Sequence, residues 1–184
     1  MSNISIIGLG GMARAIGARA VESGHTVEVI GRDAVKAKEV AAALGATAGT
    51  FGATPAGELV ILAVPHAGGV PVVAQYGEAL ADKVIVDISN TFAGPDDTVL
   101  VTPEGSSGAQ EIAEAAPASA HVVKAFNTVF GHVLAKGGPL DVLVAGDDAG
   151  AKASVTAFVE SLGLRPLDAV AWRWRTGWRA PACC

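Results

Sequence analysis

The amino-acid sequence predicts an α/β fold in which a doubly wound, mostly parallel sheet is covered by helices on both faces. Short apolar runs alternate with longer segments of helical period, which is the pattern of repeated strand–helix–strand units. Most apolar runs are continuous rather than alternating, as expected for strands that are buried on both faces. The 184 residues are 51% hydrophobic and 17% charged, which fits one globular domain with a sizeable core.

Strands and helices are expected to alternate along the chain. The strands are expected at residues 4–7, 26–30, 59–64, 84–88, 121–125, 142–145 and 165–167. The helices are expected at residues 11–23, 33–44, 72–80, 107–115 and 148–162. Gly24, Gly45 and Gly163 each stand where one of these helices should end. Since ligands of doubly wound sheets bind at the carboxyl ends of the strands, the functional site is expected at that edge.

The first strand runs directly into a glycine-rich turn and then a helix. The turn reads Gly8-Leu9-Gly10-Gly11-Met12-Ala13, a Gly-x-Gly-x-x-Ala pattern. Gly8 would allow the tight turn, Gly10 would let the backbone approach a pyrophosphate, and Ala13 would let the helix pack closely on the strand. The amino end of the helix offers free N–H groups to an anion. Because the pattern follows a strand and opens a helix, it predicts a Rossmann-type dinucleotide-binding turn rather than a turn without a ligand.

The end of the second strand indicates which dinucleotide binds. NAD-binding proteins carry Asp or Glu there for the ribose 2′-hydroxyl, but this chain has Gly31 followed by Arg32. A guanidinium can bind a 2′-phosphate in a fork, whereas a carboxylate would repel it. Lys36 adds a second cation, and Asp33 is interpreted as the N-cap of the next helix. The sequence therefore predicts NADP(H), with the alternative that Arg32 and Lys36 are solvated surface residues.

Three later strands end on residues suited to the nicotinamide side of such a site. The residues expected to line it are Ala63, Val64, Pro65, His66, Asn90, Ala125, Phe126 and Asn127. His66 is the candidate catalytic residue, because it could donate to a reacting oxygen or ring nitrogen; a loop histidine without chemistry is the alternative. Asn90 and Asn127 could bind a carboxamide or substrate, although Asn127 could instead cap its own turn. Phe126 could pack on a flat ring.

The composition argues against several other classes of function. A net charge of −5 gives no basic footprint for nucleic acid. No apolar run reaches the roughly 18 residues of a membrane span, and no basic leader opens the chain. The sequence shows no metal-ligand spacing, no nucleophile–base pair and no signal of a buried lysine. Since both cysteines are adjacent at positions 183 and 184, they form no disulfide framework, and a reducing cytoplasm is expected. The expected partner is a small-molecule or coenzyme substrate. A homo-oligomer is left open.

The last residues depart from this pattern. Residues 170–184 have no helical or strand period, and all three tryptophans and both cysteines lie within residues 172–184. We interpret residues 1–169 as the NADP-binding Rossmann domain and residues 170–184 as an atypical tail. Two explanations stand: a shifted reading frame that replaced the terminal segment, or a surface arm whose tryptophans pack on a partner chain.

Three stretches together resemble a known family. They are Ile6-Ile7-Gly8-Leu9-Gly10, Val122-Val123-Lys124-Ala125-Phe126-Asn127-Thr128, and Gly146-Asp147-Asp148 with residues 161–169. The set resembles the NADPH-dependent deazaflavin (coenzyme F-420) reductase family over residues 1–169. It is also similar to the cytoplasmic reductase domain of the six-transmembrane ferric reductases, which shares the Lys-Ala-Phe-Asn-Thr run. The resemblance implies nucleotide binding at Gly8, Gly10, Gly31, Arg32 and Lys36, and a nicotinamide-side loop at residues 64–66.

The resemblance also implies a reaction. It is direct hydride exchange between NADPH and a flavin-like ring, with no acid–base residue required. The expected function is therefore that of an NADPH-dependent oxidoreductase acting on a deazaflavin or flavin coenzyme. An NADPH-dependent reductase of an imine or carbonyl substrate is the alternative enzyme. A non-catalytic NADPH-binding regulatory protein is the alternative that requires no reaction.

Overall fold

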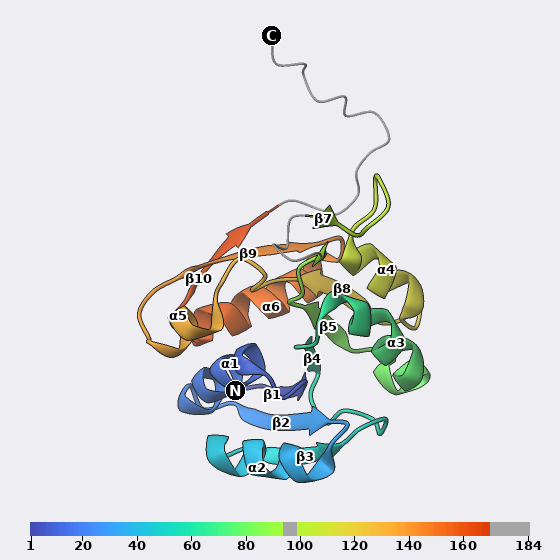
Figure 1. Cartoon of the computed structure of the whole chain (residues 1–184). Helices are drawn as coiled ribbons and strands as arrows, with labels where there is room; N and C mark the ends of the chain where they lie inside the picture. The colour runs from blue at the N-terminus through green and yellow to red at the C-terminus, as the bar shows by residue number, and fades with distance from the viewer. Residues whose placement is uncertain (94–98, 170–184) are drawn as a thin grey trace.

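The computed structural model describes residues 1–93 and 99–169 of the chain. The atypical tail expected at residues 170–184 lies outside the described residues. Figure 1 shows a central sheet with helices on both sides, and the amino terminus beside α1 (Gly11–Glu22).

The central sheet has eight strands. They are β1 (Asn3–Ile7), β2 (Thr26–Gly31), β3 (Thr47–Thr50), β4 (Leu59–Leu62), β5 (Val84–Asp87), β8 (His121–Lys124), β9 (Asp141–Gly146) and β10 (Arg165–Asp168). Their order is β10-β9-β8-β5-β4-β1-β2-β3, and every neighbouring pair is parallel except β8 with β9. The chain moves outward from β1 in one direction and from β4 in the other, which confirms the predicted doubly wound, mostly parallel sheet.

The helices cover both faces of the sheet (Figure 1). They are α1, α2 (Ala34–Leu44), α3 (His66–Tyr76), α4 (Gly108–Ala115), α5 (Gly131–Ala135) and α6 (Ala149–Ser161), with a 3₁₀ turn η1 at Gly77–Leu80. Alternate strand residues point to opposite faces. Ile6 therefore lies in a core with α1, α2 and α6, whereas Ile7 lies in a second core with α3 and α4. Burial on both faces explains the continuous apolar runs of the strands.

The caps of the helices agree with the sequence. Asp33 is the N-cap of α2, since its Oδ1 accepts hydrogen bonds from the backbone N–H groups of Val35 and Lys36, both at 3.0 Å. Gly45 ends α2 in the left-handed conformation, with φ of 69°. Gly24 and Gly163, which follow α1 and α6, also have positive φ values. These three glycines therefore stop their helices as predicted.

The structure departs from the expected elements in four places. Helix α3 begins at residue 66 rather than at 72, although Gly68, Gly69 and Pro71 all disfavour helix. Packing overrides that preference, because a Cβ at Gly69 would lie only 3.1 Å from Ile112 of α4. The edge strand β3, the short helix α5 and the hairpin of β6 (Phe92–Ala93) and β7 (Val99–Leu100) were not predicted, since each is too short to show a period.

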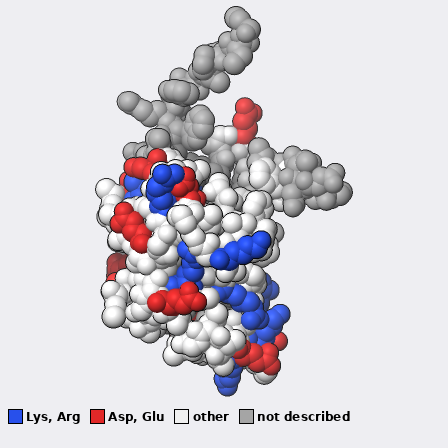
Figure 2. Space-filling view, turned by 90° about the vertical axis from the view of Figure 1, so that its left-hand side faces the viewer, with Lys and Arg blue, Asp and Glu red and all other residues white. Residues whose placement is uncertain are grey.

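The surface carries charges of both signs. On the face drawn in Figure 2, lysines and arginines alternate with aspartates and glutamates over a largely uncharged surface. Within residues 1–93 and 99–169, no helix is both long and apolar enough to cross a membrane.

Candidate dinucleotide site

The glycine turn between β1 and α1 has two kinds of glycine. Gly8 is required by the fold, because its φ is 138° and a Cβ there would lie 2.1 Å from the carbonyl oxygen of Ala63. Gly10 and Gly11 are different, because a Cβ on either would meet no atom within 4 Å. The backbone above them is therefore open to an approaching group, which is the shape that a pyrophosphate requires.

The first turn of α1 is suited to an anion. Gly10 is its N-cap and gives no side-chain cap to the free N–H groups, and no acidic residue lies in the first turn. Ala13 is 1% exposed and packs in the core under the turn, as its predicted role requires. Arg14 is exposed, and its Nε donates to the carbonyl oxygen of Leu9 at 3.3 Å. A cation so close to the positive end of the helix is unfavourable unless an anion offsets it, so the turn fits a dinucleotide phosphate.

The end of β2 carries no side chain but is followed by cations. Gly31 is buried and lies beneath the side chain of Leu9, whereas Arg32 and Lys36 are exposed. Among the described residues Arg32 has no acidic partner within salt-bridge distance. Oδ1 of Asp33 accepts the amides of α2, which holds this carboxylate at the start of the helix. Arg32 is therefore available to an anionic ligand, as the sequence predicts.

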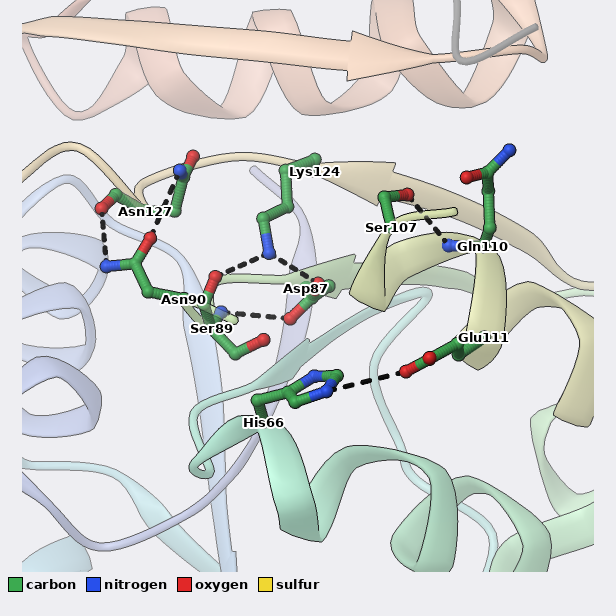
Figure 3. A network of polar contacts seen from close by, with 9 residues as sticks. All are labelled: His66, Asp87, Ser89, Asn90, Ser107, Gln110, Glu111, Lys124 and Asn127. Atoms are coloured by element: carbon green, nitrogen blue, oxygen red, sulfur yellow. Dashed lines mark hydrogen bonds and ion pairs between the residues drawn. The ribbon is translucent and has the colours of Figure 1, made fainter. Parts of the chain in front are cut away.

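His66 opens α3, and its side chain points toward Glu111 (Figure 3). Its side chain is 15% exposed, and Nε2 lies 3.4 Å from Oε2 of Glu111 on α4. Its Nδ1 is buried and has no hydrogen-bond partner among the described residues. The ring also leaves no room for a side chain at residue 108, because a Cβ at Gly108 would lie 2.8 Å from Nδ1 of His66. The imidazole therefore has Nε2 facing a carboxylate, while Nδ1 has no hydrogen-bond partner within residues 1–93 and 99–169.

A buried ion pair joins the ends of β5 and β8 (Figure 3). Nζ of Lys124 lies 2.6 Å from Oδ2 of Asp87, with exposed fractions of 16% and 1% for the two side chains. The same Nζ donates to the carbonyl oxygen of Ser89, and the N–H of Ser89 donates to Oδ1 of Asp87 at 2.9 Å. The pair therefore fixes the loop that follows β5 to the end of β8.

The two predicted asparagines bind each other across these loops. Nδ2 of Asn90 donates to the carbonyl oxygen of Asn127 at 3.0 Å, and Nδ2 of Asn127 donates to Oδ1 of Asn90 at 3.3 Å. Both bonds are exposed, and both residues line a cavity of about 190 Å³ with Ser107, Gly108 and Lys124. The structure thus brings Asn90 and Asn127 together at one polar edge.

Phe126 corrects one sequence expectation. Its side chain is 1% exposed and meets the ring of Phe158 edge-to-face at a centroid distance of 6.4 Å. The ring belongs to the core, so the expectation that it packs on a flat ligand is wrong. Its backbone has a φ of 61°, which turns the chain between Ala125 and Asn127. The residue therefore shapes the loop rather than contacting a ligand through its side chain.

The two halves of the site are in contact. Gly8 of the glycine turn touches Ala63, which is followed by Val64, Pro65 and His66. A Cβ at Gly131, at the start of α5, would lie 3.2 Å from Sδ of Met12 in the first turn of α1. The loop that holds Asn127 therefore packs beside the glycine turn, and the sequence-predicted residues share the carboxyl edge of the sheet.

Sequence reasoning missed several polar residues of this edge. Arg14, Asp87, Glu111 and Lys124 were not selected, although Asp87 is buried and Lys124 is partly buried beside it. Asp87 and Lys124 are register partners that end two apolar strands, Val84–Asp87 and His121–Lys124. Opposite charges at the ends of adjacent buried strands were the signal that would have found them. Glu111 follows from no motif, since only the packing of α3 on α4 brings it to His66.

Comparisons with known proteins agree with this geometry. Residues 3–91 match the family model described as "NADP oxidoreductase coenzyme F420-dependent". The chain is 30% identical over 171 residues to the metalloreductase STEAP3 of Rattus norvegicus, a match that covers 90% of this chain. The chain spans about a third of the length of that relative, 33%.

Solved structures share the fold over nearly the whole chain. A protein from Arthrobacter sp. FB24, described as an F420-dependent NADP reductase, has a TM-score of 0.81 and 26% identity, covering 94% of this chain and 86% of its own. The SMa0349 protein of Sinorhizobium meliloti has a TM-score of 0.80 and the same identity and coverage. An imine reductase from Aspergillus terreus, solved with NADPH4, shares the fold at 22% identity and a TM-score of 0.72, covering 94% of this chain and 56% of its own.

The fold and the site together define the class of protein: an α/β protein with a Rossmann-type sheet and an open glycine turn, similar in sequence and fold to NADP-dependent oxidoreductases. Over residues 3–91 the chain is similar to the family of coenzyme F420-dependent NADP oxidoreductases.

Proposed function

We propose that this protein binds NADP(H) at the carboxyl edge of its sheet and exchanges hydride between it and a deazaflavin or flavin coenzyme. The observation that carries the proposal is the pairing of an open glycine turn with an exposed arginine. Gly10 and Gly11 have clear space above them, and the next strand of the sheet, β2, ends in Gly31 followed by the exposed Arg32. A phosphate-binding turn beside a guanidinium suits a dinucleotide with a 2′-phosphate.

Each part of the nucleotide has a candidate partner in this chain. The free N–H groups at the start of α1 would hold the pyrophosphate. Arg32 and Lys36 would bind the 2′-phosphate, with the guanidinium as the fork and the ammonium as a point charge. The loops of Val64–His66, Asn90 and Asn127 would border the nicotinamide. NADPH supplies the hydride when bound, so the protein has to orient two rings and exclude water.

Two observations support a deazaflavin as the acceptor: the similarity to an F420-dependent family, and the commitment of the nearby charged residues Asp87 and Lys124 to other contacts. The family is described as coenzyme F420-dependent, and the Arthrobacter protein carries the same description. Asp87 and Lys124 are committed to each other and to Ser89, so neither is free to shuttle a proton. Hydride transfer between stacked rings requires no such shuttle, and a deazaflavin is therefore the acceptor that this site favours.

A second candidate is reduction of an imine or carbonyl. The observation that favours it is the imidazole of His66: Nε2 lies near Glu111, and Nδ1 has no hydrogen-bond partner in the part of the chain that the structure describes. When the carbon of an imine or carbonyl accepts hydride, its nitrogen or oxygen needs a proton, and a histidine beside a carboxylate could supply one. The shared fold of the imine reductases is compatible with this chemistry.

Isotope transfer tests the proposal. The purified protein is incubated with NADPH deuterated at either face of C4 and with an oxidised deazaflavin, a flavin, or a panel of imines and carbonyls. The proposal expects deuterium from one face at the ring carbon of the deazaflavin. Deuterium in an imine or carbonyl product alone would support the second candidate. Stoichiometric NADPH binding without turnover of any acceptor would contradict both and would indicate a regulatory NADPH-binding protein.

A further inference from the structure

Leu9 occupies the space in front of Gly31. A Cβ at Gly31 would lie 2.5 Å from Cδ1 of Leu9, 2.7 Å from its Cγ and 3.0 Å from its Cδ2. Its φ lies outside the left-handed region, so the backbone itself would accept another residue. The three nearest atoms all belong to the end of one side chain. Leu9 is therefore the obstacle to any side chain at residue 31.

The blocked position is the one that distinguishes the two dinucleotides. Gly31 is the last residue of β2, next to the glycine turn, where an acidic side chain would reach the ribose 2′-hydroxyl of NADH. We infer that Leu9 is a specificity-determining residue, because its side chain fills the volume that a ribose-binding carboxylate at residue 31 would need. This inference rests on the proposed binding of NADP(H) at this turn.

Leu9 and Arg32 would then act on specificity in different ways. Arg32 attracts the 2′-phosphate, whereas Leu9 prevents the alternative contact to an unphosphorylated ribose. Leu9 is half-buried and packs against the larger core, so moving it aside would expose apolar surface. A single acidic substitution at residue 31 should therefore fail to create an NADH site, and a second change at Leu9 should be required.

Four variants test this directly by fluorescence titration with NADPH and NADH. They are Gly31→Asp, Leu9→Ala, the Leu9→Ala/Gly31→Asp double variant and the Leu9→Ile/Gly31→Asp double variant, which keeps the volume of residue 9. Gly31→Asp should weaken NADPH by about 10-fold or more without improving NADH, since a charge-assisted contact is lost or opposed. The Leu9→Ala double variant should bind NADH about 10-fold more tightly than Gly31→Asp, and the Leu9→Ile double variant should not.

Two results would overturn the inference. One is that Gly31→Asp alone binds NADH as tightly as the Leu9→Ala/Gly31→Asp double variant. The other is that the Leu9→Ile/Gly31→Asp double variant binds NADH as tightly as the Leu9→Ala/Gly31→Asp double variant. A parent protein that binds no NADPH at all would instead overturn the proposed function, and the inference with it. The parent titration therefore separates the two failures.

A stability cycle covers the case in which Gly31→Asp does not fold. Gly31→Ala adds only the Cβ that would meet Leu9, so it should lower the unfolding temperature. Leu9→Ala/Gly31→Ala should lose less than the sum of the two single losses, because the truncation removes all three colliding atoms. Losses that simply add would overturn the inference.

Discussion

Lys124 and Asp87, register partners at the ends of β8 and β5, form a buried ion pair with 2.6 Å between Nζ and Oδ2. Both carboxylate oxygens of Asp87 have a partner, because Oδ2 faces Lys124 and Oδ1 accepts the N–H of Ser89. Asn90 and Asn127, which follow these strand ends, bind each other nearby. The ion pair thus anchors both loops that border the proposed nicotinamide side.

Removing the lysine should destabilise the fold sharply. Lys124→Met leaves the Asp87 carboxylate, 1% exposed, without its counter-charge, and breaking such a pair costs about 3–5 kcal/mol. Urea unfolding measures the loss. The Asp87→Asn/Lys124→Met double variant should lose clearly less than the sum of the two single variants, since no unpaired charge remains. Additive losses would mean that the two residues do not act as a pair.

Two glycines of the same turn should respond in opposite ways to valine. Gly10→Val should fold normally, because its side chain points into open space, with φ of −79° at the N-cap of α1. It should weaken NADPH by about 5–150-fold, the equivalent of an overpacking cost of about 1–3 kcal/mol. Gly8→Val should fail to fold, since its Cβ would collide with the Ala63 carbonyl. Circular dichroism and a binding titration report the two effects separately, and full NADPH affinity in Gly10→Val would mean that the turn does not hold the phosphates.

His66 distinguishes the two candidate reactions. If hydride passes between stacked rings, His66→Ala should slow turnover by less than the roughly 10²–10⁴-fold that general acid–base catalysis contributes. Glu111→Gln, which changes the partner of Nε2, should have a smaller effect in the same direction, and Glu114→Gln, exposed on the same helix, should have none. Steady-state kinetics, with the NADPH affinity of each variant measured in parallel, distinguishes the two reactions. A larger loss in His66→Ala with intact affinity would make His66 an acid and favour an imine or carbonyl substrate.

His25 should make stability depend on pH. Burial lowers the pKa of His25 from its ordinary 6.5, and its Nδ1 accepts the N–H of Ser2 while Nε2 lies 2.7 Å from Oγ of Ser161. Ser161 donates its own proton to the Phe158 carbonyl, so it can only accept from His25, and the neutral ring satisfies both contacts. Below about pH 6.5 the unfolded chain binds more protons at this residue than the folded chain. The free energy of unfolding should therefore fall as the pH drops through 6.5 toward the lowered pKa.

The matched variant for this pH effect is His25→Gln, which keeps polar contacts but does not titrate. Urea unfolding between about pH 7.5 and pH 5.5 should show a smaller loss of stability in the variant than in the parent, since other histidines contribute equally to both. Equal losses in the two proteins would show that His25 is not the group responsible.

The sequence predicted the parts of this molecule that depend on local pattern. The glycine turn, the Asp33 cap and the buried strands each carry a period or a motif, and each lies where it was expected. The start of α3 was missed because its stability comes from packing of Gly69 on Ile112, against the preference of the residues. Phe126 was assigned to a ligand because it follows a strand that ends at the expected site, but its backbone turns at φ of 61° and its side chain lies in the core. The contact of His66 with Glu111 could not be predicted, because it depends on the packing of α3 on α4 and no motif links the two residues.

The most direct test of the account is an equilibrium titration of NADPH and NADH against the parent protein and Arg32→Ala. Arg32 is exposed and has no acidic partner among the described residues, so its loss should act through the 2′-phosphate alone. A charge-assisted hydrogen bond contributes about 1.5–3 kcal/mol, so NADPH should weaken about 10–150-fold. NADH should change little, and Lys38→Ala, an exposed cation on the same helix as Lys36, should affect neither. A parent that prefers NADH, or an equal loss for both dinucleotides in Arg32→Ala, would contradict NADP(H) binding at this site.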